Sequence, residues 1–109
     1  MPSRISGTTT DDWAEVTSFS GGDDGVKAFG ALKNTGPEAL LLRLDLTDYD
    51  GNVETYEPPA LAAGEFFPFS TVASSYGMAA RPPYEKIVVQ TKSSSAGKST
   101  GYNLLTTQF

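Results

Sequence analysis

The sequence predicts an all-β protein, a single Greek-key, immunoglobulin-like β-sandwich of about seven short strands. In residues 39–47, Ala-Leu-Leu-Leu-Arg-Leu-Asp-Leu-Thr, leucine occupies every second position from Leu40 to Leu46. Such alternation is typical of a half-buried strand, because successive side chains point to opposite faces of a sheet. Turn-forming residues also recur at short intervals, and no stretch has a convincing helical period. A small barrel is the alternative architecture for the same strands.

Residues 39–47 are expected to form a central strand with alternate leucines in the core. Turn residues flank the segment, Asn34-Thr35-Gly36-Pro37 before it and residues 48–52 after it. Residues 26–33 also alternate, and we expect them to form a hairpin with the leucine strand. Gly30 inside that segment indicates a bulge or a close approach of two backbones.

The other expected strands are shorter, and they cover residues 13–19, 53–57, 66–69, 84–92 and 101–107. Residues 53–57 are expected to pair back across the Asp50-Gly51 turn, and residues 93–100 to form a hairpin loop. Phe66 and Phe69 are both assigned to the core, as aromatic residues of a short strand usually are.

The chain is divided into a polar N-terminal arm, residues 1–12, and a sandwich domain, residues 13–109. The arm is rich in Ser, Thr and Gly. We expect it to be flexible, because such a segment buries too little apolar area to order itself. The alternative is an arm that becomes ordered on a neighbouring subunit.

Two absences limit the chemistry of these 109 residues, since the chain contains neither cysteine nor histidine. Without cysteine there is no thiolate nucleophile and no Cys-based metal site, and without histidine the usual general base at neutral pH is missing. Residues 97–100, Gly-Lys-Ser-Thr, lack the earlier glycine and the following helix of a phosphate-binding loop. We therefore expect no enzyme activity, no cofactor and no metal centre.

The formal net charge of −5 disfavours nucleic acid as a partner, because DNA and RNA are negatively charged. The eight basic residues are spread singly along the chain and form no basic patch in the sequence. No apolar stretch reaches membrane-spanning length, and none resembles a signal peptide, so we expect a protein made in the cytoplasm that does not enter a membrane. Acidic residues occur in expected loops, in residues 48–52 and at positions 11, 12, 23 and 24. Residues 48–52 are expected to form a turn, and Asp11, Asp12, Asp23 and Asp24 to be solvated, with an adventitious cation site as the alternative.

The remaining signal is a group of side chains of the types enriched at protein interfaces. Most of them lie on or beside a long irregular stretch, residues 70–83. The candidate partner-binding residues are Trp13, Tyr76, Met78, Arg81 and Tyr84. Ordinary anchoring of the loop to the core is the alternative role for those beside it.

Three features together support a family resemblance. Residues 34–37 lead into the alternating leucines, Leu61-Ala-Ala-Gly-Glu65 precedes an aromatic strand, and Tyr84-Glu-Lys-Ile-Val-Val is followed by Ser-Ser-Ala-Gly and a closing Gly-Tyr-Asn-Leu strand. In this order, residues 26–107 resemble the small β-sandwich virion proteins of tailed bacteriophages, above all capsid decoration (cement) proteins.

The resemblance implies a non-enzymatic virion protein that is assembled in the host cytoplasm and lies on the capsid surface. Its implied partner is the major capsid protein, and it is implied to be a homo-oligomer. We expect residues 1–12 and 70–83 to carry the contacts. The alternatives are a neck, head-to-tail or tail accessory protein, and a carbohydrate- or receptor-binding sandwich module that uses exposed aromatic rings.

Overall fold

The computed structural model describes residues 2–21, 25–71 and 84–108. These ranges contain strands and no helix, and therefore no helix that could span a membrane. The strands are β1 (Pro2–Thr8), β2 (Ala14–Ser20), β3 (Ala28–Asn34), β4 (Leu40–Asp48), β5 (Val53–Tyr56), β6 (Phe66–Ser70), β7 (Tyr84–Ser93) and β8 (Gly101–Gln108).

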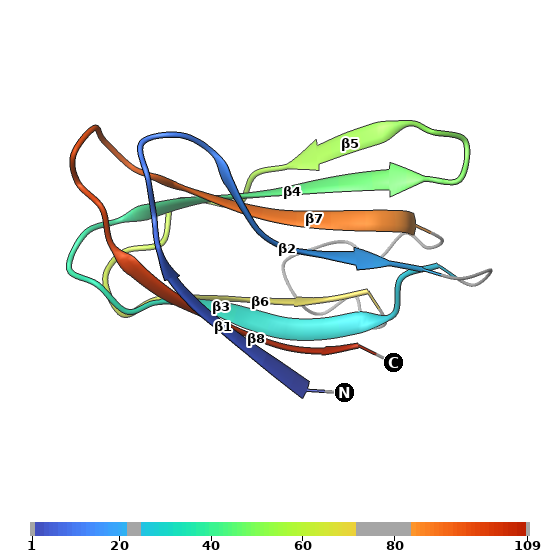
Figure 1. Ribbon diagram of the computed structural model, residues 1–109, viewed down its shortest axis with the longest axis horizontal. Coiled ribbons are helices and arrows are strands. Elements are labelled where there is room, and N and C mark those ends of the chain that lie inside the picture. Colours follow the sequence, from blue (N-terminus) through green and yellow to red (C-terminus); the bar gives the residue numbers. More distant parts are fainter. Residues whose placement is uncertain (1, 22–24, 72–83, 109) are drawn as a thin grey trace.

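The strands form two four-stranded antiparallel sheets that pack face to face, with the orders β1-β8-β3-β6 and β2-β7-β4-β5 (Figure 1). Of these eight strands, only β4 and β5 are consecutive in sequence and paired with each other. This is the strand order of a jelly roll, a sandwich built from two Greek keys. The predicted all-β sandwich is confirmed, and its order is that of a jelly roll with an eighth strand, not that of an immunoglobulin domain.

The alternating leucines of β4 lie in the core, as predicted. Leu40, Leu42, Leu44 and Leu46 are each at most 4% exposed. They pack between the sheets with inward-facing side chains of the opposite sheet, among them Leu32, Phe69 and Leu104. The predicted strand is therefore central to the fold. Its leucines lie in the core, and β4 pairs with β5 on one side and with β7 on the other.

The predicted hairpin between residues 26–33 and the leucine strand is wrong. β3 pairs with β6 and β8, whereas β4 belongs to the other sheet. Residues 93–100 likewise join β7 and β8 across the two sheets and do not close a hairpin. Alternation determines which side of a strand is buried, but it does not determine the partner of the strand. The patterns of both strand pairs are equally compatible with pairing in one sheet and with packing across two sheets.

The expectation of a flexible arm is wrong for residues 2–8, which form the edge strand β1 and pair with β8. Backbone hydrogen bonds along β8 hold this strand, and within residues 3–8 the half-buried Ile5 packs on the core. A polar composition is compatible with an edge strand, because the ladder is formed by backbone N–H and C=O groups and does not require apolar side chains on the outer face. Deleting the segment would therefore remove one strand of the sandwich.

Gly30 marks a close approach of two backbones, as its place within a strand indicates. A Cβ atom at this position would lie 2.1 Å from the carbonyl oxygen of Leu105 on β8. Since the obstacle is backbone, any larger residue requires β3 and β8 to move apart.

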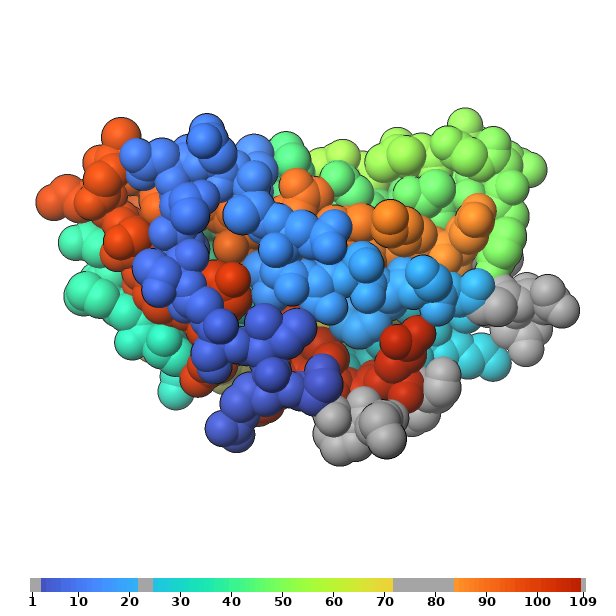
Figure 2. Space-filling model, viewed as in Figure 1, coloured from blue at the N-terminus to red at the C-terminus, as the bar shows by residue number. Residues whose placement is uncertain are grey.

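The β4–β5 hairpin forms a corner of the molecule, green in Figure 2, and Asp48 organises its turn. Asp48 Oδ1 accepts hydrogen bonds from the backbone amides of Asp50 and Asn52, both at 2.9 Å. Gly51 supplies the left-handed conformation, with φ of 86°. The predicted turn is confirmed. These hydrogen bonds, with the amide of Asn52 as the largest cause, lower the pKa of Asp48 below its ordinary value of 3.8.

The lowered pKa makes the stability of the fold depend on pH. Because the pKa of Asp48 is lower in the folded than in the unfolded chain, its contribution to stability is fully present above pH 3.8 and is lost as pH falls through the folded pKa. We expect Asp48→Asn to lose less stability than the wild type between about pH 7 and about pH 3, since an amide does not titrate. Urea denaturation midpoints at both pH values measure this, and equal losses in the two proteins would contradict it.

Candidate functional site

The two outer faces of the sandwich carry different surfaces. The first lies on the β2-β7-β4-β5 sheet and is called the Trp13 surface, consisting of Trp13, Arg43, Asp45, Gln90 and Lys92. Trp13 immediately precedes β2 and is half-buried. The guanidinium carbon of Arg43 lies 4.4 Å from the centroid of the Trp13 ring, and the ammonium of Lys92 lies 6.0 Å from it. Both cations face outward, because they alternate with buried residues along β4 and β7.

A chain of hydrogen bonds also holds Arg43 in place. Arg43 Nη2 donates to Gln90 Oε1 at 2.8 Å, and Gln90 Nε2 donates to Asp45 Oδ2 at 2.6 Å. Thr55 Oγ1 donates to the second oxygen of Asp45 at 3.0 Å. The guanidinium is thus fixed between a ring and an amide, although its buried Nε atom makes no hydrogen bond. Arg43 is one of the eight basic residues spread singly along the sequence, yet the fold places it in a defined cluster with Trp13 and Gln90.

The predicted partner-binding residues do not form one cluster. Trp13 lies on the surface just described. Tyr84, the first residue of β7, is 6% exposed and belongs to the core, at the opposite end of that strand from Lys92. The Tyr84 side chain lies between the sheets as part of the core. Tyr76, Met78 and Arg81 lie outside the described residues, as does most of the stretch 70–83.

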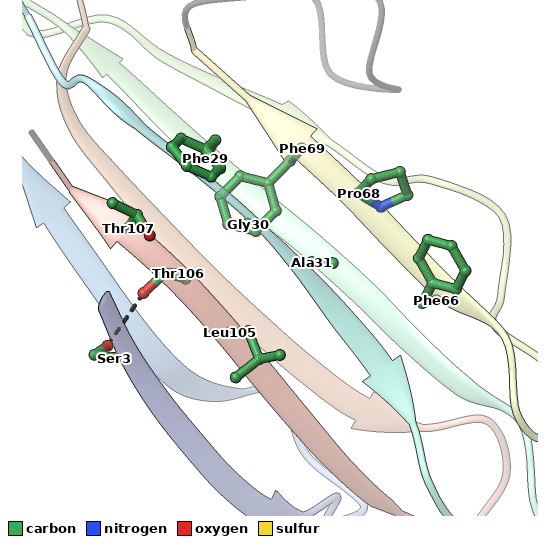
Figure 3. Close-up of a pocket in the computed structure, with 10 residues that line it drawn as sticks. All are labelled: Ser3, Phe29, Gly30, Ala31, Phe66, Pro68, Phe69, Leu105, Thr106 and Thr107. Carbon is green, nitrogen blue, oxygen red and sulfur yellow. Dashed lines mark hydrogen bonds between the residues drawn. The ribbon is translucent and has the colours of Figure 1, made fainter. Parts of the chain in front are cut away.

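The second surface is an apolar groove of about 550 Å³ on the outer face of the β1-β8-β3-β6 sheet. Its apolar lining comes from three strands: Phe29 and Ala31 of β3, Phe66 and Pro68 of β6, and Leu105 of β8 (Figure 3). Ala31 lies opposite both Pro68 and Leu105 in the ladder, so the lining is continuous across the sheet. Phe29, Phe66 and Leu105 are 39%, 62% and 48% exposed, respectively.

The groove contradicts one prediction and confirms another. Phe69 is in the core at 3% exposure, as expected, but Phe66 is exposed to solvent. The two-residue period of a strand predicts this difference, because residues three apart, such as Phe66 and Phe69, face opposite sides of a sheet. Phe67, which was not assigned, takes the second inward position.

In the described ranges, no group of three or more acidic, histidine or cysteine side chains is placed to hold a metal ion. The Asp11 carboxylate instead accepts a hydrogen bond from the backbone amide of Gly97 at 2.9 Å and ties the β7–β8 connection to the segment before Trp13.

Comparison with known proteins gives a fold and no family. The sequence matches no known protein family and no curated protein. Among solved structures, the chain is similar to a subunit of Bacillus endospore appendages, described as disulfide-linked pili, with a TM-score of 0.52 and 15% identity over 97% of this chain and 82% of that chain. Because this chain has no cysteine, it cannot make such disulfide links itself.

Two further similarities are with infectious bursal disease virus particles. For the T13 viral particle the TM-score is 0.48, with 15% identity over 99% of this chain and 31% of that chain. For the VP2 subviral particle it is 0.47, with 18% identity over 96% of this chain and 30% of that chain. This chain thus spans less than a third of either virus protein.

Proposed function

We propose that this protein is a non-enzymatic structural component of a virion, a decoration protein that binds the major capsid protein on the outer lattice of a bacteriophage capsid and stabilises it. The observation that carries the proposal is the Trp13 surface, where a tryptophan ring stacks on a fixed arginine. Tryptophan and arginine are the residues that most often dominate protein–protein binding energy. The resemblance of residues 26–107 to phage virion proteins supports the choice of partner.

The arrangement suits binding to a repeated lattice. Arg43 is already held by Gln90 and Trp13, so little side-chain freedom is lost when a partner covers it. A capsid presents many identical sites, so contacts that are weak singly become strong for an oligomer. The sandwich supplies a rigid support, because both residues are fixed at a regular sheet and not on a long loop.

Removing the ring tests the proposal. We expect Trp13→Ala to weaken binding to capsids that lack the protein by about 10- to 100-fold, since truncating a dominant interface residue costs about 2 kcal/mol or more. The measurement is occupancy after titration of purified protein onto such capsids and sedimentation. Lys86→Ala, an exposed cation on the outer face of the same sheet, is the matched control and should bind as the wild type does.

An intermediate variant separates charge from geometry. Arg43→Lys keeps the cation but loses the planar group that contacts both Trp13 and Gln90. It should bind more weakly than the wild type, while its melting temperature changes little. Full occupancy by folded Trp13→Ala would rule out this surface as the capsid contact.

A further inference from the structure

The exposed large hydrophobic side chains of the described residues gather in two places. Phe29, Phe66 and Leu105 line the apolar groove, and Tyr49 and Val53 lie on the β4–β5 hairpin, 44% and 62% exposed. We call residues 48–54 the hairpin tip. Single exposed apolar residues need no explanation, but groups of them mark contact sites.

The two patches carry opposite charges. None of the strands β1, β8, β3 and β6 contains an acidic residue, and their charged residues are Arg4 and Lys33. Arg4 lies opposite Leu105 in the β1–β8 ladder, and Lys33 lies opposite Phe66 in the β3–β6 ladder, so both border the groove. The hairpin tip contains Asp48, Asp50 and Glu54 and no basic residue. In a chain with a net charge of −5, a basic apolar groove is the exception and selects an acidic apolar partner.

A copy cannot fill its own groove with its own tip. The groove lies on the outer face of one sheet, because its exposed lining residues Phe66 and Leu105 are each followed or preceded in their strands by a buried, inward-facing residue, Phe67 and Leu104. The hairpin belongs to the other sheet, and β5 is the edge strand on the far side of the sandwich from β1 and β8 (Figure 1). The tip that enters a groove must therefore come from another molecule.

The tip is also preshaped as an insert. The hydrogen bonds from the amides of Asp50 and Asn52 to Asp48 close the turn, so the tip loses little freedom on binding. The open groove has a volume of about 550 Å³, which is ample for two side chains such as those of Tyr49 and Val53.

We propose that the hairpin tip of one copy binds the apolar groove of a second copy, in a head-to-tail contact. Such a contact uses different patches on its two partners, so the dimer keeps one free groove and one free tip and can add further copies until a ring closes. A groove-to-groove dimer is disfavoured, because it brings Arg4 and Lys33 of the two copies together. The contact would join neighbouring decoration proteins and in this sense rests on the proposed function, but it uses neither Trp13 nor Arg43.

A complementation experiment tests the contact. Light scattering over a range of concentrations should show that the wild type forms dimers and larger species. Leu105→Asn in the groove and Val53→Asn at the tip should each weaken self-association at least about tenfold. Mixed in equal amounts, the two variants should form a dimer and stop, because the intact tip of one fits the intact groove of the other.

Controls keep the outcome decisive. Val88→Asn, the same substitution at a half-buried position on the outer face of the other sheet, should associate as the wild type does. If Leu105→Asn or Val53→Asn melts at a lower temperature than the wild type, Phe66→Asn replaces the groove variant and Tyr49→Asn replaces the tip variant. A wild type that stays monomeric, a tip variant that still dimerises, or a mixture that forms no dimer would each overturn the proposal. Trp13→Ala should self-associate normally, so failure here and failure of capsid binding are distinguishable.

Discussion

Leu44→Ala is expected to lower the free energy of unfolding by about 2–5 kcal/mol, which is the usual cost of emptying a leucine-sized space in a well-packed core. Leu44 is 1% exposed and lies between the two sheets, on the strand that pairs with both β5 and β7. Strands on both sides limit how far β4 can move to fill the cavity. A loss of this size is a large share of the about 5–15 kcal/mol that stabilises a typical domain.

The matched control is Leu41→Ala, which removes the same atoms from the same strand. Leu41 is half-buried on the outer side of the sheet, so its truncation leaves no closed cavity and should cost about 1 kcal/mol or less. Urea denaturation of both variants measures the difference. Equal losses would contradict the assignment of inner and outer faces on which the whole sandwich depends.

Asn34→Ala is expected to destabilise the fold by about 3–5 kcal/mol, because it leaves several buried polar groups without partners at once. Asn34 is 0% exposed. Its Nδ2 donates to the carbonyl oxygens of Glu38 at 2.6 Å and Leu61 at 3.0 Å. Its Oδ1 accepts from the amide of Gly36 at 3.1 Å and from the hydroxyl of Thr100 at 2.9 Å. One amide side chain therefore joins three connections at one end of the sandwich.

The comparison is with Asn103→Ala, a half-buried asparagine on β8 whose Oδ1 accepts a hydrogen bond from the exposed hydroxyl of Ser6. Water can replace that bond, so the loss should be about 1 kcal/mol or less. Asn34→Asp should be no better than Asn34→Ala, since it cannot donate to the two carbonyls. Denaturant midpoints compared with the wild type measure all three variants, and a small effect of Asn34→Ala would mean that water satisfies those groups.

The strands that could be predicted are those whose own side-chain pattern shows that the segment is a strand and which of its sides is buried. β4 was assigned correctly because four alternate leucines have one common buried side. β1 could not be assigned in this way, because an edge strand is held by the backbone of β8, and the partner lies about a hundred residues away in the sequence. Which strands share a sheet was also beyond prediction, since the inward side of β3 is buried whether β4 lies beside it or opposite it.

The candidate site was predictable by residue type and not by arrangement. Trp13 was selected because its residue type is enriched at protein interfaces, but its contact with Arg43 depends on the alignment of β2, β7 and β4. The groove had a signal that went unused, because Phe66 and Phe69 cannot both face inward from one strand. Its other side comes from β8, and no local pattern places Leu105 next to Ala31.

The strand order has a consequence for how quickly the chain can fold. Apart from the β4–β5 hairpin, every pairing among the described strands joins segments that are distant in sequence, and β1 pairs with β8, the last strand. Closing such large loops is slow, so refolding is expected in the range of milliseconds to seconds, typical of sandwiches with mainly nonlocal pairing. During synthesis β1 emerges first and has no partner until β8 is made, so the sandwich is completed only after translation of its final strand.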